Sequence, residues 1–152
     1  MIQRIQSIYL LIASILLATI FIFPYAELLG ANDQVYIFNY NGLSILGQDN
    51  LYLLTVPPII LLVLTVLISF VSIFLFKKRI IQMRLNFINL ILILGYLGLN
   101  YYYIHSFSNQ LNGMVSYKIT AAFPLVAVIL IFLAIKSIGK DEALIRSMDR
   151  LR

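Results

Sequence analysis

Four long runs of apolar residues alternate with polar stretches along the chain, and they predict its architecture. The runs cover residues 5–23, 53–76, 85–103 and 119–135, and none of them contains a charged side chain. A helix needs about 20 apolar residues to cross the hydrocarbon core of a bilayer. The pattern therefore predicts an all-α membrane protein in which a four-transmembrane-helix bundle forms a single domain over residues 1–152.

The overall composition supports a lipid environment. Hydrophobic residues make up 62% of the chain and charged residues 11%, whereas a soluble domain has about 45–50% apolar and about 25% charged residues. The first run is longer than the 7–15 residues that are usual in the apolar core of a signal peptide. The Pro-Tyr-Ala sequence that follows it is a poor cleavage site, so we expect the first run to be a retained helix.

The positions of the basic residues predict the orientation. In a four-pass topology, ten of the eleven Lys and Arg residues fall on one side, and only Lys118 falls on the other. The basic side is expected to face the cytoplasm, together with both termini. This orientation gives outer loops at residues 24–52 and 104–118, a cytoplasmic turn at 77–84 and a cytoplasmic tail at 136–152.

The two outer loops differ in their expected structure. In the first, residues 35–40 and 43–46 are rich in apolar and β-branched side chains and flank Asn41-Gly42. An Asn-Gly pair between two such runs is a strong signal for a tight hairpin turn. We therefore predict a small β-hairpin, with an irregular loop around a tight turn as the alternative. The second outer loop is polar and is expected to be a simple connector.

The cytoplasmic tail has the pattern of a short amphipathic helix over residues 141–152. Its apolar residues recur at i, i+4 and i+7, and its basic residues lie toward the end, where they suit the helix dipole. The residues expected to contact lipid or a partner are Leu144, Met148, Leu151, Arg146, Arg150 and Arg152. The alternative is a short capping helix that only anchors the last span.

The third run contains a face of asparagines on one side of the expected helix. This helix-packing polar face consists of Asn86, Asn89 and Asn100. The favoured interpretation is hydrogen bonding between helices, which contributes about 1 kcal/mol per contact in a membrane. The alternative is a polar seam that lines a path or binds a lipid headgroup. Thr65, Ser69 and Ser72 form a stripe of small residues on the second run, which indicates close helix packing.

Little in the sequence points to chemistry. The chain has no cysteine and a single histidine, which excludes disulfides, thiolate metal sites and paired-histidine haem ligation. The apolar runs lack the ionisable residues that proton relays and ion-coupled carriers use. We therefore predict no catalytic residue, no metal site and no cofactor. Since the basic residues flank the apolar runs, no nucleic-acid partner is expected.

The two ends of the chain carry its most specific sequence features, MIQRIQS at the start and KDEALIRSMDRLR at the end. With them, the whole chain resembles an uncharacterised family of small four-span bacterial membrane proteins, known only as a domain of unknown function. The resemblance implies a location in the bacterial cytoplasmic (inner) membrane. It implies no activity, cofactor or binding residue.

Three hypotheses of function follow, in decreasing order of preference. The first is a non-enzymatic accessory or scaffold subunit of a larger membrane assembly, with membrane lipids and a protein partner or a second copy as its contacts. The second is a small oligomeric transporter or channel, because four spans rarely enclose a pore alone. The third is a membrane enzyme acting on a lipid or quinone, for which the outer side offers only widely spaced groups. Those groups are Glu27, Asp33, Asp49 and His105.

Overall fold

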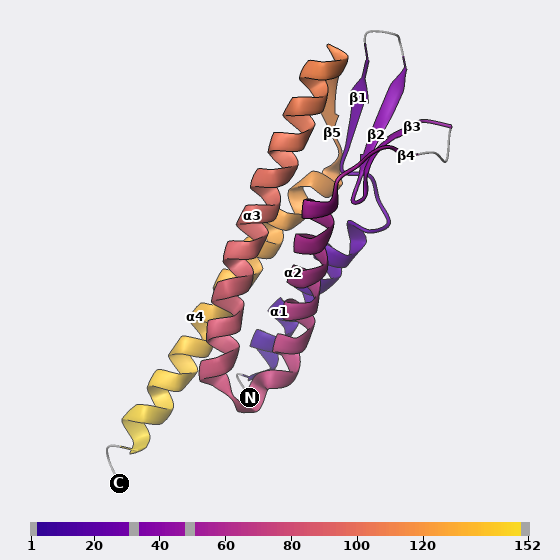
Figure 1. Cartoon of the computed structure of the whole chain (residues 1–152). Coiled ribbons are helices and arrows are strands. Elements are labelled where there is room, and N and C mark those ends of the chain that lie inside the picture. The colour runs from indigo at the N-terminus through magenta and orange to yellow at the C-terminus, as the bar shows by residue number, and fades with distance from the viewer. Residues whose placement is uncertain (1–2, 31–33, 48–50, 150–152) are drawn as a thin grey trace.

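The computed structural model describes residues 3–30, 34–47 and 51–149, which form a helical bundle with a sheet at one end (Figure 1). The α-helices are α1 (Gln3–Thr19), α2 (Val56–Phe74), α3 (Arg79–Leu111) and α4 (Phe123–Asp149). Short 3-10 helices, η1 (Leu75–Lys77) and η2 (Ile119–Ala122), precede α3 and α4. Both α1 and α3 pack against α2 and α4, so the four helices form a square bundle.

The outer surface of the bundle is apolar. The helices α2, α3 and α4 are long and apolar enough to cross a membrane, while the apolar part of α1, Ile5–Thr19, is shorter. Large exposed apolar side chains occur on every helix, for example Ile8, Leu67, Ile91 and Ile129. Exposing such side chains to water costs about 25 cal/mol per Å². The bundle surface therefore suits lipid as its surroundings.

In each helix, the spacing between successive buried residues alternates between three and four positions. In α1 these are Gln6, Leu10, Ala13 and Leu17, and in α2 they are Pro58, Leu62, Thr65, Ser69 and Ser72. In α3 they include Gln82, Asn86, Asn89, Ile93, Tyr96 and Asn100, and in α4 they are Ala127, Ile131, Ala134, Ile138 and Asp141. An average spacing of 3.5 residues keeps one seam of each helix facing its neighbours, as in a left-handed coiled coil.

Five antiparallel strands form the sheet, in the order β4-β3-β2-β1-β5. They are β1 (Ala26–Leu29), β2 (Val35–Asn39), β3 (Gly42–Ile45), β4 (Leu51–Leu54) and β5 (Met114–Tyr117). The predicted hairpin is present as β2 and β3, but the expectation of only two strands was wrong. The strands β1 and β5 have only four residues each, too few for an alternating pattern to stand out in the sequence.

Gly42 makes the β2–β3 turn possible. Its φ angle is +134°, a conformation that residues with a Cβ rarely adopt. A Cβ atom at this position would also collide with the Leu53 carbonyl group of β4. Gly42 is therefore required both for the turn and for the close approach of β4.

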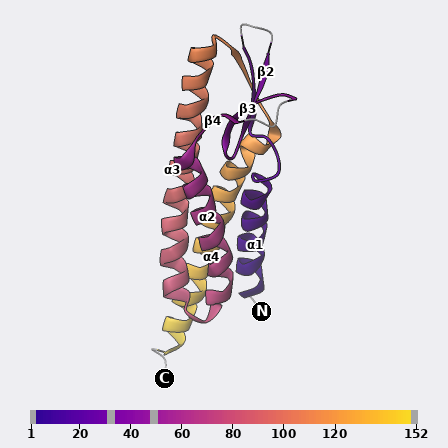
Figure 2. The same cartoon turned by 45° about the vertical axis from the view of Figure 1, so that its right-hand side comes forward.

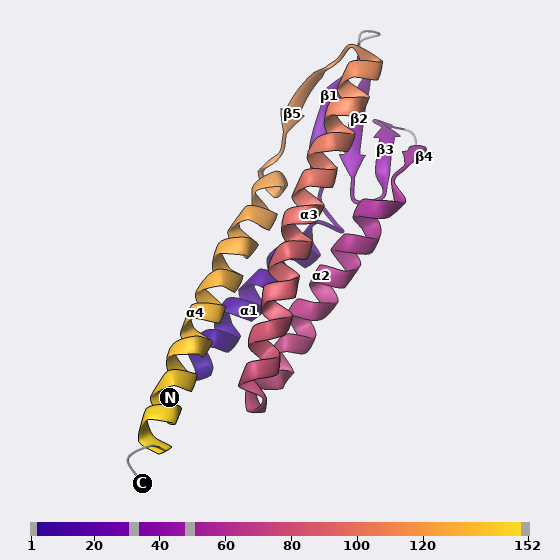
Figure 3. The ribbon, with the colours of Figure 1, turned by 60° about the vertical axis from the view of Figure 1, so that its left-hand side comes forward.

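The sequence predicted a simple connector for the second outer loop, and this prediction was wrong. The helix α3 continues well past Tyr103 to Leu111, and Asn112 ends it in the left-handed conformation with φ 45°. The chain then returns along β1 as β5 (Figure 3). This helical extension was missed because its polar residues outnumber its buried ones, Ile104 and Phe107.

Aromatic side chains attach the sheet to the bundle. Tyr25 packs edge-on against Tyr96 of α3, with ring centroids 6.3 Å apart, and Phe38 of β2 lies 6.1 Å from Phe107. Such pairs contribute about 0.5–1.5 kcal/mol beyond the area they bury. Burial raises the pKa of the Tyr25 hydroxyl to about 12, and the nearby Tyr117 adds to this shift.

The end of the bundle opposite the sheet also differs from the prediction. The chain passes from η1 into α3 at Arg79, so the turn expected at residues 77–84 is much shorter. The tail is not a separate helix, because α4 runs without a break through Gly139 to Asp149. A glycine inside a helix costs about 1 kcal/mol relative to alanine. Ile138 and Asp141, on either side of Gly139, are buried against the bundle, and this packing outweighs that cost. The first turn of α1 and the last turns of α4 both lie at this end (Figure 2).

Candidate functional site

The interior of the bundle is polar in the half that lies away from the sheet. We call this region the polar core, and its members are Gln6, Ser69, Ser72, Gln82, Asn86, Asn89 and Asp141. All four helices contribute to it, and every member is at most 7% exposed. Burying polar groups in a membrane is costly unless they bond to one another. Their partners therefore decide what the region can do.

Hydrogen bonds join α2 to α3 across the polar core. The Asn89 amide donates to the Ser69 hydroxyl at 2.7 Å, and the Ser72 hydroxyl donates to Asn86 Oδ1 at 2.8 Å. Gln82 Nε2 donates to the Ser72 carbonyl oxygen at 2.9 Å. The heptad spacing of the two helices brings these residues into register. The small side chains on α2 let the amides of α3 approach closely.

A separate bond joins α1 to α4. Gln6 Nε2 donates to Asp141 Oδ2 at 2.5 Å, and both side chains are buried. Asp141 was expected to begin a separate cytoplasmic tail helix, so this contact with α1 was not predicted. The signal was present, because Asp141 continues the heptad spacing of Ala134 and Ile138.

Three polar atoms of α3 in this region have no hydrogen-bond partner within the described part of the chain. They are Gln82 Oε1, Asn86 Nδ2 and Asn89 Oδ1. The residues are spaced i, i+4 and i+7, so these atoms lie along one face of the helix. Two of them are acceptors and one is a donor, but Gln82 and Asn89 lie about 10 Å apart along the helix axis, too far for one water molecule to bond to all three. Each of these atoms therefore leaves hydrogen-bonding capacity unused inside the bundle.

The predicted asparagine face lies in the interior, but its members are not together. Asn86 and Asn89 belong to the polar core, while Asn100 lies nearer the sheet and is 2% exposed. Its Nδ2 atom has no partner among the described residues. Only Asn86 and Asn89 are placed to act as a unit.

The tail residues that were expected to contact lipid or a partner are described only in part. The Leu144 side chain is 55% exposed and, with Lys140 and Ala143, lines a shallow hollow of about 370 Å³. Arg150, Leu151 and Arg152 lie outside the described residues, and so do the side chains of Arg146 and Met148. The expected stripe therefore stays a prediction beyond Leu144.

A second candidate surface, which the sequence did not predict, lies on the face of the sheet that points away from α3. Strand register places Met114 beside Leu29 and Leu29 beside Val35, and the Leu46 amide donates to the Val35 carbonyl oxygen. The side chains at these positions lie in a row across the end of the sheet farthest from the bundle. We call them the outer apolar row, and its members are Met114, Leu29, Val35 and Leu46. Met114 is 81% exposed, Leu46 58% and Leu29 47%. Contiguous exposed apolar side chains are typical of interaction surfaces.

One ion pair lies beside this surface. Lys118 is the single basic residue of the expected outer side. Its Nζ atom is 2.8 Å from Oε1 of Glu27 on β1. Both side chains are more than a third exposed, so the pair contributes at most about 1 kcal/mol. Its main effect is to neutralise Lys118 locally.

Comparisons with known proteins identify a family but no activity. The comparison with curated proteins gave no match. The profile of the family described as "Domain of unknown function (DUF4293)" matches residues 2–151. Because this match covers nearly the whole chain, the protein belongs to the DUF4293 family.

Proposed function

We propose that the chain is a four-span protein of the bacterial inner membrane, with both termini in the cytoplasm and the sheet on the outer side. The apolar surface of α2, α3 and α4 supports three spans. For the fourth, α1 is about 25 Å long at 1.5 Å per residue, and hydrogen-bonded turns extend its apolar run to Phe23. Ten of the eleven basic residues fall on the side of this topology that we assign to the cytoplasm, which supports the orientation.

Within the membrane, the protein acts as a non-enzymatic accessory or scaffold subunit of a larger assembly. The observation that supports this role is the outer apolar row, which the bundle displays at the far end of a sheet anchored by Tyr25 and Phe38. Hydrogen bonds between α2 and α3 use much of the bonding capacity inside the bundle. The displayed sheet is therefore the better candidate for the working surface.

A small oligomeric transporter or channel is the second candidate. The unpartnered polar atoms of Gln82, Asn86 and Asn89 favour it, since a permeating polar species needs such groups inside the membrane. An oligomer would be required, because four spans rarely enclose a pore alone.

Purification in a gentle detergent with mass spectrometry tests the preferred role. The unmodified chain should purify with a different protein in a fixed ratio, and Met114→Asn or Leu46→Asn should release that protein. Ser116→Asn is the matched control, because Ser116 lies on the same face of β5 one row nearer the bundle. The control should retain the partner. A pure homo-oligomer would favour the transporter, and a partner retained by all variants would remove the outer apolar row from the proposal.

A further inference from the structure

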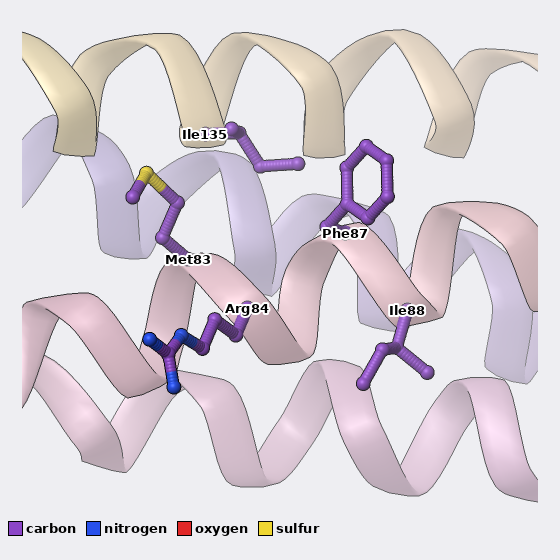
Figure 4. Close-up of a pocket in the computed structure, with 5 residues that line it drawn as sticks. All are labelled: Met83, Arg84, Phe87, Ile88 and Ile135. Carbon is purple, nitrogen blue, oxygen red and sulfur yellow. The ribbon is translucent and has the colours of Figure 1, made fainter.

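A groove between α3 and α4 opens on the surface of the bundle in its half away from the sheet. It has a volume of about 520 Å³ and is lined by Met83, Arg84, Phe87, Ile88 and Ile135. Figure 4 shows Met83 and Phe87 pointing toward Ile135 of α4, while the Arg84 side chain extends away from it. Four of the five lining side chains are apolar, and Arg84 provides the single charge.

The position of Arg84 along α3 gives the groove a polar end and an apolar end. Phe87 and Ile88 lie one turn nearer the sheet than Arg84, which is about 5–6 Å along the helix axis. In the proposed topology, on which this inference rests, Arg84 then lies near the headgroups of the cytoplasmic leaflet. Phe87 and Ile88 lie deeper, at the level of the acyl chains.

The charges around the groove are mostly positive. The exposed Lys78 precedes Arg84 on the chain, and Lys136 and Lys140 follow Ile135 on α4. Of the acidic residues on this part of α4, Asp141 is buried against Gln6, and Glu142 lies about two turns beyond Ile135. Among the described residues, no carboxylate forms an ion pair with Arg84. The guanidinium group is therefore available to an anion from outside the chain.

We propose that this groove binds an anionic phospholipid, with an acyl chain on Phe87 and Ile88 and the headgroup phosphate on Arg84. The volume is in the range of small-molecule sites, about 300–1,000 Å³, whereas a partner helix would need a longer continuous surface. Guanidinium groups bind phosphate through two parallel hydrogen bonds. Basic pockets between helices on the cytoplasmic side suit anionic headgroups for the same reason. Zwitterionic lipid also has a phosphate, but its headgroup ammonium offsets that charge, so Arg84 favours lipid with a net negative headgroup.

Tryptophan fluorescence provides the test, because the chain contains no tryptophan. Phe87→Trp places a single reporter in the groove of the full chain, reconstituted in phosphatidylcholine vesicles. A fixed fraction of lipid with brominated chains, either phosphatidylglycerol or phosphatidylcholine, then quenches the reporter when it is in contact. Phe70→Trp is the matched control, because Phe70 is an exposed apolar residue on α2 outside the groove.

Phosphatidylglycerol should bind beside Phe87→Trp about fivefold more strongly than phosphatidylcholine, and beside Phe70→Trp about equally. One basic residue contributes about 1 kcal/mol near an anionic headgroup, which corresponds to this ratio. Adding Arg84→Gln should abolish the preference. Adding Lys78→Gln, which removes the same charge from outside the groove, should largely retain it.

Three outcomes would overturn the lipid site. They are equal quenching by both lipids at Phe87→Trp, a preference that Arg84→Gln leaves unchanged, and no quenching by either lipid because a protein surface covers the groove. Both leaflets of the vesicles have the same composition, so the result does not depend on orientation. A failure of the proposed topology is detected separately, by cysteine labelling at Ser116 and Ser147.

Discussion

The hydrogen bond between Asn89 and Ser69 offers a direct measure of how the polar core holds α2 to α3. Both side chains are fully buried, and the donor and acceptor are 2.7 Å apart. We consider Ser69→Ala, Asn89→Leu and the double variant. Leucine has the same branching and number of side-chain heavy atoms as asparagine, so the substitution removes polarity with little change of shape.

The two single variants should differ in cost. Ser69→Ala leaves the Asn89 amide group buried without its acceptor, which costs about 1–3 kcal/mol. Asn89→Leu should cost less than about 1 kcal/mol, because it also removes the unpartnered Oδ1 atom. In addition, the Ser69 hydroxyl can then donate to a carbonyl oxygen of its own helix, as Thr65 does to Leu62. The double variant should therefore be about as stable as Asn89→Leu alone.

Reversible unfolding in mixed micelles, followed by circular dichroism, measures these free energies. The coupling energy of the pair should equal the cost of Ser69→Ala and should fall at about 1–1.7 kcal/mol, since polar pairs between membrane helices couple by at most about 1.7 kcal/mol. The control cycle combines Asn89→Leu with Ser14→Ala, since the Ser14 hydroxyl donates to the Leu11 carbonyl oxygen of its own helix. That cycle should be additive within about 0.3–0.5 kcal/mol. Additivity in the Ser69 cycle would refute the argument that this bond stabilises the bundle.

Three further predictions concern the sheet and its attachment to the bundle. Gly42→Ala should destabilise the sheet, because its Cβ atom would collide with the Leu53 carbonyl group; limited proteolysis should then cut the outer region faster than in the unmodified chain. Phe107→Ala should lower the free energy of unfolding by about 3–5 kcal/mol, as measured by denaturant titration, because it removes a buried ring that packs on Phe38. Tyr25 should account for about 3 kcal/mol of the stability lost between pH 10 and pH 12, because it ionises near pH 10 in the unfolded chain but near pH 12 in the folded one. Tyr25→Phe should remove that part of the pH dependence, and an unchanged alkaline profile would contradict it.

The sequence predicted the features that repeat along the chain. The apolar runs correspond to the four helices, and the Asn41-Gly42 pair correctly indicated a hairpin. Asn86 and Asn89 could be assigned to one face because the helical period is regular. Each of these features depends on local spacing, which a single sequence records.

The features that were missed depend on contacts between distant segments. The strand β5 exists because β1, far away in the sequence, offers it an edge, and MVSY alone carries no strong strand signal. The bond between Gln6 and Asp141 spans nearly the whole chain. The groove near Arg84 depends on how α3 and α4 pack, which the pattern of either helix does not specify. The outer apolar row also appears only once the strand register is known.

Cysteine labelling tests the central claim, a four-span bundle that places the sheet outside the membrane and both termini in the cytoplasm. The chain has no cysteine, so Ser116→Cys on β5 and Ser147→Cys near the end of α4 each introduce a single thiol. In intact cells, a maleimide that cannot cross the inner membrane should label Ser116→Cys. It should label Ser147→Cys only after that membrane is permeabilised. Labelling of Ser147→Cys in intact cells, with Ser116→Cys protected, would contradict the proposed orientation.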